Sequence, residues 1–189
     1  MLTKKVKLLF SLLIIAISLG AQTLENTGKI NWGIEYDLMA PRIGQWYNFN
    51  INGWIRHGQR IKHSLVLANI DINEKHLTEE SFQKDILTAF GYRGEIFSHR
   101  DMKRWSTGII FLFSMHHVET SINQQSGRFN TFFTGVPIGY TWVLWKHLTI
   151  NPNISVLVPL TNQKVQIGTD EVSQAPWGLE PGLRIGYRF

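Results

Sequence analysis

Residues 30–38 read Ile-Asn-Trp-Gly-Ile-Glu-Tyr-Asp-Leu, a strict alternation of apolar side chains with small or polar ones. Successive side chains of a β-strand point to opposite faces, so this stretch predicts a strand with one apolar and one polar face. The apolar face would carry Ile30, Trp32, Ile34, Tyr36 and Leu38. Gly33, Glu35 and Asp37 would lie on the other face.

Seven further segments alternate in the same way or form apolar runs of strand length. They are residues 47–56, 61–72, 85–98, 105–119, 128–145, 148–160 and 179–189. The facing of 61–72 is ambiguous, and in 105–119 Ile110 and Leu112 fall on the expected polar face. Pro137 predicts a bulge, because proline lacks the N–H that a central strand donates. The sequence therefore predicts eight strands in a single all-β domain.

The connections between these segments differ in length. Short ones lie around 57–60, 99–104 and 146–147, and longer polar ones at 73–84, 120–127 and 161–177. Short periplasmic turns and longer external loops are typical of an antiparallel up-and-down transmembrane β-barrel. An even number of strands also places both chain ends on the same side.

The composition of the polar faces favours a barrel in lipid over a barrel in water. These faces carry Asn, Gly, Thr and Ser, and lysine is almost absent, whereas a water-exposed face is rich in charged residues. Aromatic residues stand toward the segment ends, where rings suit a headgroup boundary. The expected girdles contain Trp46 and Trp177 at one boundary, and Trp32, Trp105, Trp142, Tyr187 and Phe189 at the other. A soluble barrel with core aromatics is the alternative.

The first 21 residues have the layout of a secretory signal peptide. Lys4, Lys5 and Lys7 precede an apolar run at 8–19, and cleavage is expected after Ala21. An uncleaved anchor helix is the alternative. Residues 1–21 are thus predicted as signal peptide and 22–189 as the barrel domain. Removing the former takes the net charge from +5 to about +2, which withdraws the support for nucleic-acid binding.

The chain contains no cysteine. This excludes a disulfide scaffold, a cysteine-ligated metal centre, a thiol nucleophile and a lipoprotein anchor. No phosphate-binding glycine loop, zinc-type helix motif or nucleotide fingerprint is present. We therefore expect no cofactor and no metal site.

The last strand carries Leu183, Ile185, Tyr187 and the terminal Phe189 at every second position. In this, and in its architecture over residues 28–189, the chain resembles the family of small eight-stranded outer-membrane β-barrel proteins. The resemblance implies insertion by the barrel assembly machinery, with Tyr187 and Phe189 as its signal. It also implies contact with outer-membrane lipid and lipopolysaccharide, a location in the cell outer membrane, and a monomer.

Charged residues on the polar faces are expected inside the barrel. An eight-stranded barrel is narrow and its interior is filled by side chains, so buried opposite charges should pair. The expected lumen network consists of Glu35, Asp37, Arg56, Arg93, Glu95, Glu180, Arg184 and Arg188. We predict a plug of ion pairs; a path for protons or ions is the alternative.

One set of residues is compatible with catalysis. Ser114 and His116 share a strand face, and Glu119 follows at the strand end. A hydroxyl, an imidazole and a carboxylate at this depth would suit a lipid A-modifying acyl hydrolase or transferase. The adjacent His116 and His117 point to opposite faces, so joint metal ligation is not expected. The main prediction is a non-enzymatic role, structural or in surface recognition through the loops.

Overall fold

The computed structural model describes residues 31–40, 48–72, 82–120, 124–145, 147–161, 164–173 and 176–189. The predicted signal peptide and Trp46 lie outside these residues. No helix within the described ranges is long and apolar enough to cross a membrane.

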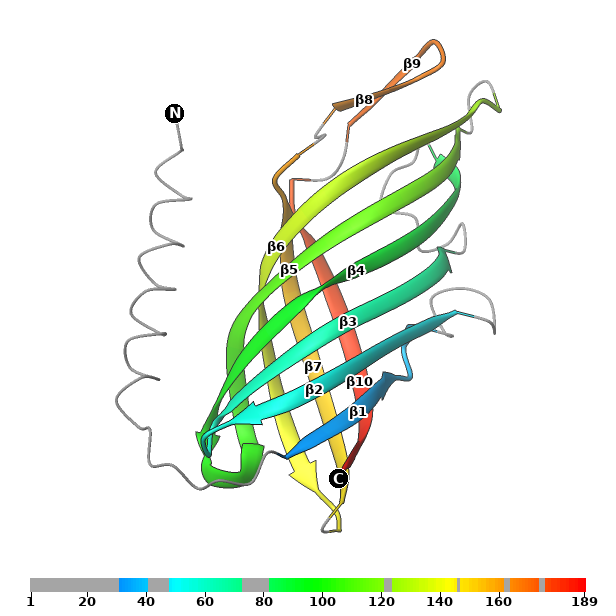
Figure 1. Ribbon diagram of the computed structural model, residues 1–189. Helices are drawn as coiled ribbons and strands as arrows, with labels where there is room; N and C mark the ends of the chain where they lie inside the picture. Colours follow the sequence, from blue (N-terminus) through cyan, green and yellow to red (C-terminus); the bar gives the residue numbers. More distant parts are fainter. Residues whose placement is uncertain are drawn as a thin grey trace, which may run out of the picture.

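Eight antiparallel strands close into a barrel (Figure 1). They are β1 (Trp32–Asp37), β2 (Phe49–His57), β3 (Ile61–Ile72), β4 (Phe82–His99), β5 (Lys103–Thr120), β6 (Ser126–Val143), β7 (Leu148–Pro159) and β10 (Gly178–Arg188). Each strand pairs with its neighbour in sequence, and β1 closes the barrel by pairing with both β2 and β10. The predicted all-β, eight-stranded, up-and-down architecture is confirmed.

The two ends of the barrel differ in their connections. At the lower end in Figure 1, residues 58–60 join β2 to β3, the short 3₁₀ helix η2 (Arg100–Met102) joins β4 to β5, and residues 144–147 join β6 to β7. The C-terminus lies at this end, which we call the turn end. The longer connections lie at the opposite end, the loop end. One of them contains a small hairpin of β8 (Lys164–Ile167) and β9 (Asp170–Ser173).

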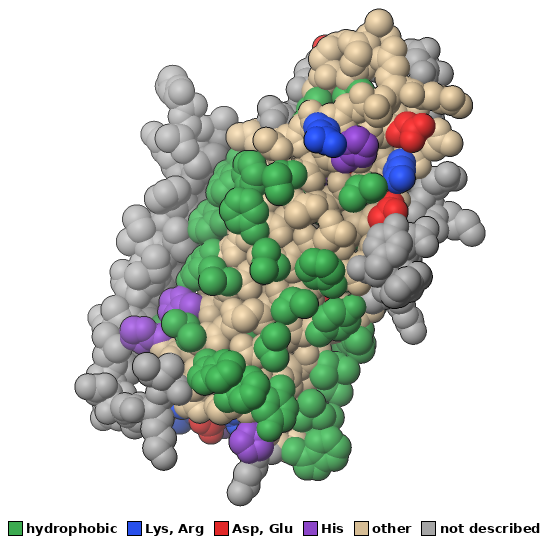
Figure 2. Space-filling model, turned by 45° about the vertical axis from the view of Figure 1, so that its right-hand side comes forward, with side chains coloured by type: hydrophobic (Ala, Val, Ile, Leu, Met, Phe, Trp, Pro, Cys, Tyr) green, Lys and Arg blue, Asp and Glu red, His purple; other side chains and the backbone are tan. Residues whose placement is uncertain are grey.

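The outer surface of the barrel is apolar. In β7, Val156 is 39% exposed while its neighbour Ser155 is completely buried, as strict alternation predicts. Figure 2 shows hydrophobic side chains spread over the middle of one face. Among the large apolar side chains exposed along the strands are Ile34, Ile55, Leu65, Leu67, Phe90, Met115, Val136, Ile138, Ile154, Val156 and Leu179. The described members of the predicted girdles, Trp32, Trp105, Trp142, Trp177, Tyr187 and Phe189, are exposed as well.

The two segments with unclear facing have apolar side chains on both faces. In β3, Val66 points inward and Leu65 outward, and in β5 Ile110 and Leu112 point inward. Val66, Ile110 and Leu112 pack together inside the barrel. The alternation is therefore blurred because the lumen contains apolar layers as well as polar ones.

The predicted bulge at Pro137 is wrong. Thr107 pairs with Ile138 and Ile110 pairs with Gly135, so the register of β5 and β6 is the same on both sides of the proline. On its other side, Pro137 pairs with Ser155 of β7 without a shift. The strand tolerates the missing donor by leaving out rungs of one ladder, not by inserting an extra residue.

The lumen is filled in layers. At the turn end, Trp54, Phe97 and Met102 pack together. A layer of charged residues follows, and then the apolar layer around Ile110. At the loop end, Ile167 of the hairpin packs on inward-facing side chains of β5 and β6.

Candidate functional site

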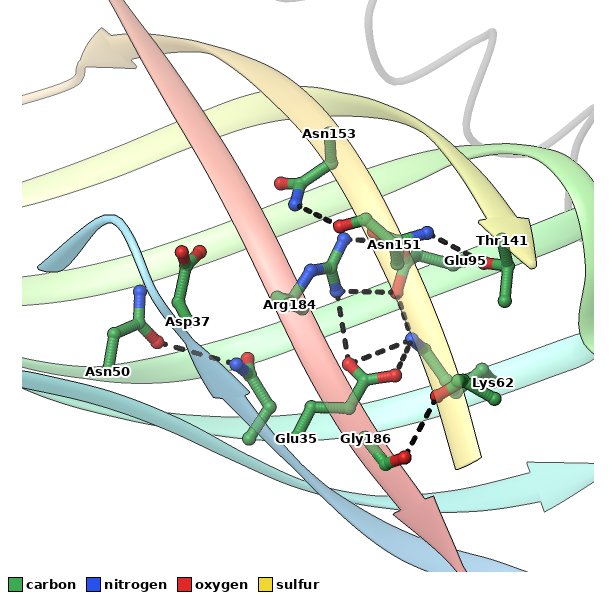
Figure 3. Close-up of polar contacts among 12 residues, drawn as sticks. Glu35, Asp37, Asn50, Lys62, Glu95, Thr141, Asn151, Asn153, Arg184 and Gly186 are labelled. Atoms are coloured by element: carbon green, nitrogen blue, oxygen red, sulfur yellow. Dashed lines mark hydrogen bonds and ion pairs between the residues drawn. The ribbon is translucent and has the colours of Figure 1, made fainter. Parts of the chain in front are cut away.

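Four buried charged side chains form a closed network in the lumen (Figure 3). The Nζ of Lys62 donates to both carboxylate oxygens of Glu35 at 3.0 and 3.1 Å, and lies 2.8 Å from Oε2 of Glu95. The guanidinium of Arg184 donates to Glu95 at 3.2 Å through Nη1 and Nη2, and to Glu35 at 3.3 Å. We call these four residues the ionic quartet. It contains two positive and two negative charges, and each cation contacts both anions.

Neighbouring strands position the ionic quartet. Lys62 of β3 lies directly opposite Glu95 of β4 in the ladder, so their side chains meet on the inner face. Glu35 of β1 lies opposite Gly186 of β10. A Cβ at position 186 would lie 2.8 Å from Cγ of Glu35, so the glycine leaves room for that carboxylate. Arg184 reaches the same level from two residues before Gly186.

Lys62 is the member of the ionic quartet that the sequence pattern did not reveal. Its side chain is only 2% exposed, and its ammonium also lies 5.6 Å from the centre of the Phe97 ring. It belongs to the segment whose facing was ambiguous. Its position between two carboxylates arises only when β1, β3 and β4 surround one lumen.

Three other predicted lumen residues lie inside the barrel wall but outside the ionic quartet. Asp37 accepts hydrogen bonds from the backbone N–H groups of Met39 and Leu183 at 2.9 and 3.0 Å. Arg93 is buried, and its Nε and Nη1 atoms have no hydrogen-bond partner among the described residues. Glu180 lies on the inward-facing side of β10, and no described cation lies within ion-pair distance of it.

The two remaining predicted lumen residues lie at the rim of the turn end. Arg56 forms an ion pair of 3.3 Å with Asp101 of η2, whose side chain is 55% exposed. The Nη1 of Arg188 donates to the backbone oxygen of Asp101 at 3.4 Å. These contacts link β2 and β10 to the β4–β5 turn.

The Ser114, His116 and Glu119 set is only partly brought together. Ser114 and His116 point into the lumen, whereas Glu119 stands on the outward-facing side of β5. The carboxylate beside His116 is Asp85 of β4, 3.0 Å from its Nδ1. The imidazole stacks on Phe129, with ring centres 4.5 Å apart, and its buried Nε2 has no partner among the described residues.

The predicted assembly signal is accessible on the outer surface. Tyr187 and Phe189 are both about half exposed, and Phe189 stacks on Trp32 with ring centres 4.0 Å apart. Tyr187 also stacks on His147. This aromatic group surrounds the junction where the last strand meets the first. Its role in assembly stays a prediction.

Within the described ranges, no group of three or more His, Asp or Glu side chains is arranged to hold a metal ion. The chemistry that the described lumen can perform is therefore charge pairing and proton exchange at His116. The ionic quartet holds its strands together and fills the cross-section between the two apolar layers.

Solved structures share this fold. The major outer membrane protein of Thermus thermophilus superposes with a TM-score of 0.51 at 9% identity, over 85% of this chain and 98% of that one. The N-terminal β-barrel domain of Pseudomonas aeruginosa OprF has a TM-score of 0.49 at 9% identity, over 85% and 96%. Neisserial surface protein A has a TM-score of 0.45 at 8% identity, over 84% and 92%. No family model and no curated protein sequence matches the chain. The chain has the fold of the eight-stranded outer-membrane β-barrels, as the resemblance implied.

Proposed function

We propose that this chain is an exported outer-membrane β-barrel protein with a structural or surface-recognition role and a lumen closed by side chains. The observation that carries the proposal is the distribution of polarity. Large apolar side chains cover the outside, and the ionic quartet is buried inside. A water-soluble barrel has the opposite distribution, while a membrane barrel has an apolar outer band and a polar interior.

The lengths of the strands support a role at the cell surface. A tilted strand needs about 9–11 residues to cross a bilayer, whereas β4, β5 and β6 contain 18 residues each. These three strands extend at the loop end, where the β8–β9 hairpin also lies (Figure 1). With short turns toward the periplasm, this extended wall and its loops face the exterior. Loops held on a rigid barrel are where recognition surfaces form.

Fractionation of cells that express the full chain tests the proposal. We expect the protein in the outer-membrane fraction of a sucrose gradient, with a mature N-terminus near Gln22 by mass spectrometry. Recovery as a soluble periplasmic protein would overturn the proposal. In a deletion strain, sensitivity to detergents supports the structural role, and loss of surface binding with an intact barrier supports the recognition role.

A further inference from the structure

The outward face of the barrel becomes polar near the loop end of β4, β5 and β6. Lys84, His117 and Arg128 are all exposed there, and we call them the upper basic cluster. In the ladders, His117 lies opposite Arg128, and Lys84 lies diagonally across from His117, one position beyond the Ile86–His117 pair. Diagonal neighbours in a sheet lie about 7–8 Å apart, within reach of long side chains. Figure 2 shows Lys or Arg, His and acidic side chains gathered at one end of the apolar face.

The upper basic cluster lies at the depth of lipid headgroups. Twelve residues of β5 separate His117 from Trp105, which belongs to the aromatic residues of the turn end. At about 3.4 Å a residue and a tilt of about 40°, His117 stands about 30 Å above Trp105. The apolar band of a membrane barrel is about 25 Å tall. The three residues therefore lie just beyond the hydrocarbon, and they face lipid because they are on the outward side.

The contacts within the cluster leave hydrogen-bond donors for a ligand. The Nε of Arg128 donates to Nδ1 of His117 at 3.2 Å. This contact fixes the imidazole as a neutral ring whose proton is on Nε2, so that Nε2 is a donor. Among the described residues, the terminal nitrogens of Arg128 and the ammonium of Lys84 form no ion pair. Two cations and an N–H donor on one patch match an anion with several oxygens.

We propose that the upper basic cluster binds a phosphate group of lipid A in the outer leaflet. The inference rests on the proposed function, since it requires the loop end to face the exterior. Lipid A presents phosphate at the headgroup level and acyl chains below it, which matches the polar cluster above the apolar strand face. Next to the cluster, Phe90, Phe113 and Phe132 form one row across β4, β5 and β6, where they contact the acyl chains.

Glu119 provides a test of charge. It lies opposite Lys84 in the β4–β5 ladder, on the same outward face. Its carboxylate repels a phosphate that approaches Lys84, so Glu119→Gln strengthens binding while removal of a cation weakens it. A variant that merely disturbed the barrel would not produce opposite effects at two paired positions.

The experiment uses the barrel refolded in detergent micelles and native mass spectrometry. The probes are lipid A with two phosphates, enzymatically dephosphorylated lipid A, and phosphatidylglycerol. We expect the protein to retain phosphorylated lipid A in preference to the other two. Lys84→Gln/Arg128→Gln should weaken this binding by about tenfold or more, because charge-assisted hydrogen bonds are lost. Glu119→Gln should strengthen it.

The matched control is Arg60→Gln/Arg100→Gln, which removes two exposed cations from the turn end and should leave binding unchanged. Equal retention of dephosphorylated lipid A or of phosphatidylglycerol would overturn the inference. An unaltered affinity in the double variant would overturn it as well. A barrel found in the outer membrane without a lipid A preference contradicts this inference alone, whereas a soluble periplasmic protein contradicts the proposed function first.

Discussion

At the scale of single residues, the ionic quartet has the largest energetic consequence. Lys62, Glu35, Glu95 and Arg184 are all buried, so each charge loses most of its hydration. Attraction between the charges offsets this loss only while all four are present. Removing one member leaves an uncompensated charge in the lumen, which costs more than removing a pair.

Lys62→Met tests this interdependence. We expect the free energy of unfolding to fall by about 3–5 kcal/mol, because Glu35 and Glu95 then share a single cation. Urea titration of the refolded protein in micelles measures it. Adding Glu35→Gln to the same chain should recover part of the loss. The control is Arg56→Gln at the exposed rim, with an expected cost of less than about 1 kcal/mol. Equal costs at the two sites would contradict the role of the ionic quartet.

His116→Ala separates structure from catalysis. We expect no change in the lipid A profile of expressing cells, since His116 faces the lumen and Glu119 faces the opposite side of β5. Stability should fall by about 1–3 kcal/mol, because Asp85 loses its partner. Ser114→Ala, which changes the same inner face without breaking that pair, serves as the control. A folded His116→Ala protein that lost a lipid-modifying activity present in the parent would favour the enzyme.

At the scale of elements, the alternation of each strand decides which residues meet lipid. A slip of one residue would exchange the two faces completely, so a strand with one apolar face has a strongly specified register. β7 shows this most simply, since the exposed Val156 and the buried Ser155 are adjacent. The same reasoning explains why β10, with aromatic and aliphatic residues at every second position, pairs with β1 in one register.

Val156→Arg and Ser155→Ala test the facing of β7. Arginine at position 156 should cost about 2–4 kcal/mol if that position lies near the bilayer midplane. Ser155→Ala should be nearly neutral, because the Ser155 hydroxyl has no hydrogen-bond partner among the described residues. The measurement is the unfolding free energy after folding into lipid vesicles. Similar tolerance of both substitutions would show that the register of β7 differs.

At the scale of the whole molecule, closure of the barrel determines how it unfolds. Each barrel strand is hydrogen-bonded on both sides, including the junction of β1 with β10, so no sheet edge is open among the described strands of the barrel. A closed barrel satisfies its backbone groups internally and has no edge from which to fray. Layers of side chains fill the lumen from the Trp54 layer to the Ile167 layer.

The protein is therefore expected to be heat-modifiable. In SDS at room temperature the folded barrel should migrate differently from the chain that has been boiled. Electrophoresis of matched unheated and heated samples measures this, and urea-denatured protein that has not been refolded provides the control. Identical migration of the refolded protein before and after heating would contradict a closed, internally hydrogen-bonded barrel.

The sequence alone determined the strands and most of their facing. The alternation at 30–38 and at Val156 depends only on neighbours along the chain, because a strand repeats every two residues. The partners inside the barrel were decided by the tertiary structure. Lys62 meets Glu35 and Glu95, and His116 meets Asp85 instead of Glu119. These contacts join residues far apart in sequence, and which of them form depends on the register of strands closed around a narrow lumen.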